Sequence, residues 1–327
     1  MACTVGKMWE FSVVRSLGLL LRTLPFLVAR AAVQCGIAAA ILLAAFVGAV
    51  AARRVEEPLS AILPGSVAVW GGLAGVLVAV ALAHARRDWL LYRITTPHIA
   101  LMVELLDRRP IPLLGGQIAH GRAVVSARFG DAPALFALNR LIRGVIRTAT
   151  RMVDGLLVDI VPSFGLDRLL RAAGLHLRLV SGLVDPMILS HALRERSENA
   201  WEAAHDGLVL YTQNARTILV NAIWLSLAGW AVAVSAAIAV LASQAFTDLL
   251  PQGSWVLPLV LAALAWTIKS SLWDPFALAC LLQLNRRLAE EQEPLPEWRG
   301  RLTQVSETFR QLGERALGWS ARGMQDI

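Results

Sequence analysis

WVLPLVLAALAWTIKSSLWDPFALACLLQ, residues Trp255–Gln283, is the stretch that decides the fold class. A transmembrane helix needs about 20 mostly apolar residues to cross the hydrocarbon core of a bilayer, and this stretch is long enough. It also carries Lys269, Asp274 and Pro275. If the helix enters the bilayer at Trp255, Lys269 lies about 21 Å deep at about 1.5 Å per residue. A charge at that depth is costly, so the stretch predicts both a membrane span and a functional position within it.

The composition of the whole chain fits a membrane protein. Of the 327 residues, 56% are hydrophobic and 17% are charged, which is too little charge to cover a soluble protein of this length. The formal net charge of +7 rests on arginine, because Lys7 and Lys269 are the only lysines. We expect anionic lipid headgroups, and no nucleic acid, as the partner of this basic chain. The cysteines are scattered without metal-ligand spacing, so we expect no cofactor.

Four segments are long and apolar enough to span a bilayer. The first two flank the break at Pro64-Gly65, and the third contains Asn221 as its main polar residue. Together with the stretch quoted above, they predict an all-α polytopic membrane protein with four transmembrane helices. The predicted spans are Ala31–Ala52, Ser66–His84, Thr217–Ser243 and Trp255–Gln283.

The distribution of arginine predicts the orientation of these spans. The segment Ala85–Arg216 carries 17 arginines and more follow the fourth span, whereas the loop Gln244–Ser254 has no lysine or arginine. Because cytoplasmic loops carry an excess of basic residues, we predict a multi-pass protein of a bacterial inner membrane with both termini in the cytoplasm. Its predicted parts are a cytoplasmic amphipathic N-terminal helix at 1–30, a transmembrane hairpin at 31–84, a cytoplasmic membrane-associated helical region at 85–216, a second hairpin at 217–283 and a cytoplasmic tail at 284–327.

The cytoplasmic middle segment has a basic stripe opposite a broad apolar face. Residues 132–153 have helical periodicity, and their arginines follow at steps of three and four, within one third of the helix circumference. This pattern predicts a helix in the headgroup layer that binds anionic lipid. Alternatively, the apolar face packs on other helices and the arginines are solvated. Residues 166–184 repeat the pattern, so the predicted lipid-binding residues are Arg140, Arg143, Arg147 and Arg151 of the first helix and Arg168 and Arg171 of the second.

The N-terminal segment repeats this pattern before the first span. A helix with basic residues and aromatic side chains is typical of an interfacial anchor, and Pro25 is placed to bend it into the span. The basic and aromatic residues are Lys7, Arg15, Arg22, Arg30, Trp9, Phe11 and Phe26.

A stripe of acidic and histidine residues follows Asp185-Pro186, which predicts a helix start because Asp caps helices and Pro suits the first turn. The stripe residues are spaced at three and four, so they share one face of the predicted helix. Glu202 and His205 have the Glu-x-x-His spacing of carboxylate-bridged metal sites, but no second such motif exists in the chain. We interpret the stripe as a solvated or arginine-paired face, with a metal or proton-relay site as the alternative. Its members are His191, Glu195, Glu198, Glu202 and His205.

In the last part of the chain, a Trp/Ala-rich stretch before one span is followed by a final apolar stretch that breaks at an aspartate. NAWEAAHDGLVLYTQNARTILVNA, residues 199–222, is a Trp/Ala-rich stretch that leads into a span, and the final apolar stretch from Trp255 breaks at Asp274. From about residue 175 to 284 this order resembles the C-terminal part of the choline transporter-like family, which covers about a third of the chain. The resemblance implies movement of a small organic cation or a lipid-derived amine. It carries over no substrate residues, and the many N-terminal spans of that family are missing here.

These features support two functional hypotheses. The first is a transport-like protein that binds or moves a small organic cation, ion or lipid-derived compound at a site near the fourth span, formed by Lys269, Asp274, Pro275 and Asn221. Alternatively, Lys269 reaches the headgroups and Asp274 caps a shorter helix. The second hypothesis is a non-catalytic membrane scaffold or accessory subunit, a homo-oligomer or part of a membrane complex. The chain has no nucleophile elbow, phosphate-binding loop or dinucleotide fingerprint, so we predict no enzyme.

Overall fold

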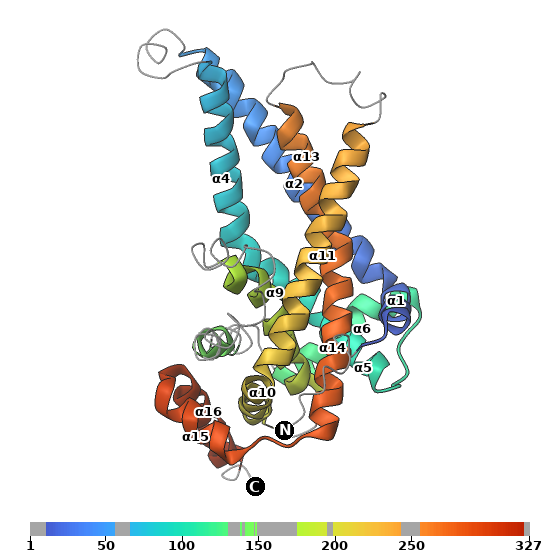
Figure 1. The fold of residues 1–327 in the computed structure, drawn as a ribbon, viewed down its shortest axis with the longest axis vertical. Helices are drawn as coiled ribbons and strands as arrows, with labels where there is room; N and C mark the ends of the chain where they lie inside the picture. Colours follow the sequence, from blue (N-terminus) through green and yellow to red (C-terminus); the bar gives the residue numbers. More distant parts are fainter. Residues whose placement is uncertain are drawn as a thin grey trace, which may run out of the picture. The chain divides into compact units, whose positions relative to one another are not determined.

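The computed structural model describes residues 11–55, 66–129, 138, 141–146, 148, 175–194, 199–242 and 256–323. Every regular element in these ranges is a helix (Figure 1). Three helices are long and apolar enough to cross a membrane, namely Leu24–Arg53, Val67–Ala85 and Ala215–Leu241. The predicted all-α class is therefore confirmed, and the chain has the helices of a membrane protein.

The chain forms two compact units. Unit 1 comprises residues 1–25, 95–227 and 274–327, and unit 2 comprises residues 26–94 and 228–273. Two of the four boundaries between the units lie at π-helical segments, at the end of η1 (Leu91–Thr95) and directly after η3 (Lys269–Trp273). Each π-helix is followed by a proline, Pro97 or Pro275, which has no N–H to donate to the carbonyl four residues earlier.

In unit 2, helices α2 (Leu24–Arg53) and α4 (Val67–Leu90) lie side by side (Figure 1). Glycine allows their backbones to approach closely. A Cβ atom at Gly48 would lie 2.2 Å from the carbonyl oxygen of Gly71, and one at Gly75 would lie 2.0 Å from the carbonyl oxygen of Ala44. This is the close contact that small residues at four-residue spacing form between membrane helices.

The rest of unit 2 is formed by the second half of α11 (Ala215–Leu241), by α13 (Val256–Ile268) and by η3. A small core of Ala233, Ala237 and Ala265, with Leu261 beside it, packs α11 against α13. Large apolar side chains of this unit point outward, as expected of helices that face lipid. They include Leu43, Phe46, Val47, Leu73, Leu77, Val78, Leu82, Val234 and Ile238.

Unit 1 has a conventional buried core. Helix α5 packs against α6 and α9, α9 packs against α10 and α14, α10 packs against α16, and α1 packs against α14. Its largest fully buried side chains include Ile99, Leu101, Met102, Ile188, Leu208 and Phe309. The helices of this unit, besides the first part of α11, are α1 (Val13–Arg22), α5 (Thr96–Leu106), η2 (Leu114–Gly116), α6 (Gln117–Phe129), α9 (Leu175–Arg194), α10 (Ala200–Gln213), α14 (Asp274–Glu291), α15 (Pro296–Val305) and α16 (Glu307–Gly323).

The stretch Trp255–Gln283, predicted to form one span, is divided between the two units. Its first part forms α13 and η3 in unit 2, and from Asp274 it continues as α14 in unit 1. Residues Ala277–Leu284 of α14 are buried in the protein, which explains their apolar character without a bilayer. The fourth span therefore stays a prediction.

The predicted helix start at Asp185-Pro186 is wrong. Helix α9 already begins at Leu175 and carries Pro186 inside it. The same helix ends at Arg194, and α10 begins at Ala200 after a separate cap, since the side chain of Asn199 accepts hydrogen bonds from the backbone N–H groups of Trp201 and Glu202. The acidic and histidine stripe is thus split between two helices.

Candidate functional site

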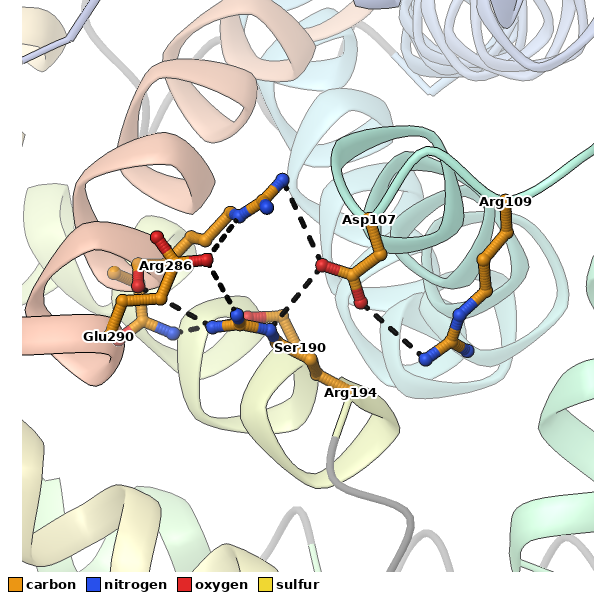
Figure 2. A network of polar contacts seen from close by, with 7 residues as sticks. Asp107, Arg109, Ser190, Arg194, Arg286 and Glu290 are labelled. Carbon is orange, nitrogen blue, oxygen red and sulfur yellow. Dashed lines mark hydrogen bonds and ion pairs between the residues drawn. The ribbon is translucent and has the colours of Figure 1, made fainter.

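A network of ion pairs joins three helices of unit 1 (Figure 2). Asp107 is the C-cap residue of α5, and Arg194 is the last residue of α9. Arg286 and Glu290 lie one turn apart on α14. One oxygen of Asp107 lies 3.4 Å from Nε of Arg194 and 3.8 Å from Nη1 of Arg286, and the other lies 3.6 Å from Nη2 of Arg109. Glu290 closes the network, because its Oε1 accepts from Arg194 at 2.8 Å and from Arg286 at 2.9 Å.

The charges alternate around this network. Two guanidinium groups, Arg194 and Arg286, each contact both carboxylates, so each positive charge has two negative neighbours. The side chain of Asp107 is mostly buried, whereas that of Glu290 is about half exposed. The hydrogen bond from Arg286 and the nearby positive charges of both arginines hold the pKa of Glu290 below its usual value.

A small cavity lies beside the network. Val103, Leu106 and Leu282 form its apolar wall. Its polar wall is formed by Ser190, His191 and Asn285, together with Asp107, Arg194 and Arg286 of the network. Asn285 donates from Nδ2 to the carbonyl oxygen of Met187 at 3.2 Å, which holds α14 against α9. The cavity has room for roughly one water molecule. It is too small for an organic substrate, and the charged residues beside it connect three helices.

The same part of unit 1 contains further polar contacts between helices. His120 on α6 lies 2.8 Å from Glu104 on α5 through its Nε2 atom. Near the other end of α5, Nε2 of His98 lies 2.9 Å from Oγ1 of Thr23, which follows α1. These contacts and the network tie α1, α5, α6, α9 and α14 into one packed unit.

The predicted transport residues fall in both units. Lys269 belongs to unit 2, where its Nζ atom lies 5.4 Å from the ring centroid of Trp230, within the range of a cation–π interaction. Trp230 in turn lies 6.1 Å from Trp266, centroid to centroid. Trp273 packs against Gly229, where an added Cβ would lie 2.2 Å from the indole. Lys269 is therefore placed among tryptophans.

The other predicted transport residues belong to unit 1. Asp274 is the first residue of α14 and directly follows the π-helix η3, and Pro275 is buried directly after it. Asn221 is buried on α11, and its Nδ2 donates to the carbonyl oxygen of Thr217 at 2.9 Å. Whether these residues act together in transport stays a prediction.

One predicted lipid-binding residue lies in the described part of the chain. Arg143 forms an ion pair with Asp185 on α9, at 3.0 Å from Nε to the carboxylate. The apolar face of the same segment is buried, as the packing alternative expects, through Leu138, Leu141, Ile142, Val145 and Ile146. The other predicted lipid-binding residues lie outside the described ranges, namely Arg140, Arg147, Arg151, Arg168 and Arg171.

The residues of the histidine and acidic stripe have separate surroundings. His191 on α9 packs against Gly207, and His205 on α10 stacks on Phe309 of α16 with ring centroids 4.0 Å apart. Glu202 is exposed in the first turn of α10, and Glu195 and Glu198 lie outside the described ranges. Within those ranges, no group of three His, Cys, Asp or Glu residues is arranged to hold a metal ion.

The network itself was not predicted. Arg286 and Glu290 have the four-residue spacing of a helical ion pair, which was the one local signal available. Asp107 and Arg194 are brought to that pair from distant parts of the chain, and no spacing rule predicts such a meeting.

The chain matches no family model, no curated protein and no solved structure. The resemblance to the choline transporter-like family therefore stays a prediction.

Proposed function

We propose that this protein is a membrane-anchored helical scaffold or accessory subunit, without catalytic activity. The observation that carries the proposal is the Asp107–Arg194–Arg286–Glu290 network, whose cavity takes roughly one water molecule. Its charged groups are engaged with one another across α5, α9 and α14. Such an arrangement holds helices in a fixed position, and a folded unit held this way in a chain that also has membrane helices is suited to present a surface to a partner.

The proposed placement has four spans, at 31–52, 66–84, 217–243 and 255–283, in a bacterial inner membrane with both termini cytoplasmic. The excess of arginine in 85–216 and in the tail supports this orientation. Anionic lipid headgroups are the proposed lipid partner of the arginine-rich segments. A second copy of the chain or another membrane subunit is the proposed protein partner.

A transport role is the second candidate, and two buried oxygen atoms on α11 favour it. Oδ1 of Asn221 and Oγ of Ser226 have no hydrogen-bond partner within the described ranges. Both residues lie in a helix apolar enough to cross a membrane. A polar atom at membrane depth needs a partner, which water or a transported compound could supply. In this case the cargo is a small organic cation, as the family resemblance implies.

Reconstituted protein distinguishes the two candidates. Wild type and two single variants, Asn221→Leu and Ser226→Ala, are placed in liposomes. Each is tested for uptake of inorganic ions and of a panel of amines that includes choline. The scaffold proposal expects no uptake above that of protein-free liposomes, and thermal stabilisation by anionic lipid alone. Uptake by wild type that both variants lose would replace the scaffold proposal with the transport one. Asp274→Asn serves as a further variant at the predicted site.

A further inference from the structure

Helix α1 has three different faces. Ser16, Leu19 and Leu20 are buried, and Arg15 and Arg22 are exposed on another side. The third face exposes a row of large apolar side chains at helical spacing. This row, the α1 apolar row, consists of Val13, Val14, Leu17 and Leu21, with Val14 80% and Leu21 71% exposed.

The buried face is attached to three helices of unit 1. Gln283 on α14 donates from Nε2 to Oγ of Ser16 at 2.6 Å and accepts from the backbone N–H of Ser12. At the other end of α1, Gln117 on α6 donates to the carbonyl oxygen of Arg22 at 2.8 Å, and Thr23 contacts His98 on α5. The helix is therefore held in one rotational position, so the α1 apolar row is a fixed surface of unit 1.

The chain itself indicates what covers this row. Only Thr23 separates α1 from α2, whose mean hydropathy over its most apolar window is 2.4 with 11% of that window buried. If α2 enters a bilayer near Ala31, as proposed above, then about two helical turns of α2 separate α1 from that point of entry. An apolar row opposite exposed arginines is what a helix needs to lie in the headgroup layer, with its apolar side against the acyl chains.

We propose that α1 docks unit 1 onto an anionic lipid surface, with the α1 apolar row inserted among the lipids and Arg15 and Arg22 close to the phosphates. This inference rests on the membrane anchorage in the proposed function, and adds the protein surface that meets the lipid. A phosphatidylglycerol surface fits because each exposed arginine near an anionic membrane contributes electrostatic attraction. The contacts of Gln283 and Gln117 then pass the position of the lipid-bound helix to α14 and α6.

Spin labels on introduced cysteines test this docking in the full chain. The background carries Cys3→Ser and Cys35→Ser and keeps the buried Cys280. The same background without an introduced cysteine measures any labelling of Cys280. Labels at Leu17→Cys and Leu21→Cys report on the apolar row. Gly18→Cys is the matched position on the other exposed side, and nothing lies within 4 Å of a Cβ there. The protein is reconstituted in phosphatidylglycerol or phosphatidylcholine vesicles, and collisions with oxygen and with a water-soluble nickel chelate are measured.

We expect the ratio of oxygen to nickel collisions to be several-fold higher at Leu17 and Leu21 than at Gly18 in phosphatidylglycerol. This difference is expected to shrink in phosphatidylcholine, and also when Arg15→Gln or Arg22→Gln is combined with a label at Leu21. Equal nickel access at all three positions would overturn the docking. Protection of Leu17 from both reagents would also overturn it, because protein would then cover the row.

A label at Leu43→Cys on α2 separates this inference from the proposed function. Leu43 is an exposed apolar residue of the first predicted span. If its label is reached by oxygen while those of α1 are reached by nickel, membrane anchorage holds and only the docking of α1 is wrong. If the Leu43 label is reached by nickel as well, the anchorage itself is wrong.

Discussion

The two units of this chain use apolar side chains in opposite ways. Unit 1 buries them in a core, as Leu101 and Phe309 are fully enclosed, whereas unit 2 turns Leu43 and Phe46 outward. Of the most apolar windows of α2 and α4, 11% and 17% are buried. One chain thus contains a part that folds as if in water and a part that folds as if in lipid, where apolar exposure carries no penalty.

The two units also join their helices by different means. In unit 2 the backbones of α2 and α4 approach through Gly48, Gly71 and Gly75, where a side chain would collide with backbone atoms. In unit 1 the helices enclose large buried side chains, and the Asp107–Arg194–Arg286–Glu290 network links α5, α9 and α14, although Gly121 also brings α6 close to the backbone of Pro97. Lipid offers no hydrophobic effect between helices, so close packing must replace it.

The largest expected effect contrasts two phenylalanines. Phe309→Ala removes a fully buried ring that stacks on His205, and we expect a loss of about 3–5 kcal/mol in the free energy of unfolding of unit 1. Phe46→Ala on α2 is the matched control, because that ring is 66% exposed and loses little protein packing. Denaturant titration in detergent, followed by circular dichroism, measures both. Equal losses would contradict the contrast between the units.

A second prediction tests the glycine contact of unit 2. Gly75→Leu places a side chain where even a Cβ would lie 2.0 Å from the carbonyl oxygen of Ala44, so α2 and α4 must separate. We expect a loss of about 1–3 kcal/mol, as for overpacked cores. Gly36→Leu is the control. Gly36 lies on α2, the helix that Gly75 of α4 contacts, but nothing lies within 4 Å of a Cβ at Gly36. Thermal unfolding in detergent compares them, and an equal shift would show that the contact is absent.

A third prediction weakens the network of unit 1. Asp107→Asn removes the negative charge that faces Arg194 and Arg286. The network then has Glu290 as its remaining carboxylate for these two guanidinium groups. We expect a loss of about 1–2 kcal/mol, smaller than for a fully buried pair because both arginines are partly exposed. Glu297→Gln, at an exposed pair with Arg301, is the control and should change stability by less than about 0.5 kcal/mol. Hydrogen exchange in α5 and α9 would report the loss locally.

The smallest expected effect concerns pH. Arg286 lowers the pKa of Glu290 in the folded protein, so the pair stabilises unit 1 above the ordinary glutamate pKa, and this contribution is lost as pH falls through the lowered value. Because the Glu290 side chain is about half exposed, we expect less than about 1 kcal/mol. Glu290→Gln should therefore be less stable than wild type at pH 7, and the difference should vanish in acid. A difference that stays constant down to pH 3 would exclude the ion pair as its cause.

The sequence by itself determined the class of the protein. Long apolar segments without charge can form only helices in lipid, because each backbone polar group must be satisfied within its own segment. For this reason the predicted all-α class is confirmed, and the first three predicted spans coincide closely with the helices that could cross a membrane. The helical periodicity around Arg143 predicted an apolar face but left open whether lipid or protein covers it, and its described apolar residues are buried in the structure.

Tertiary structure decided what these helices contact. The first part of α14 is apolar because it lies in the core of unit 1. Hydropathy alone could not show this cause, since lipid and a protein interior select the same side chains. Charge spacing placed His191 and Glu202 on one face of one helix, but His191 belongs to α9 and Glu202 to α10, which has its own cap at Asn199. Asp107 meets Arg194 and Arg286 only after α5, α9 and α14 pack together. Contacts between distant residues depend on the packing of all the helices, which no local pattern encodes.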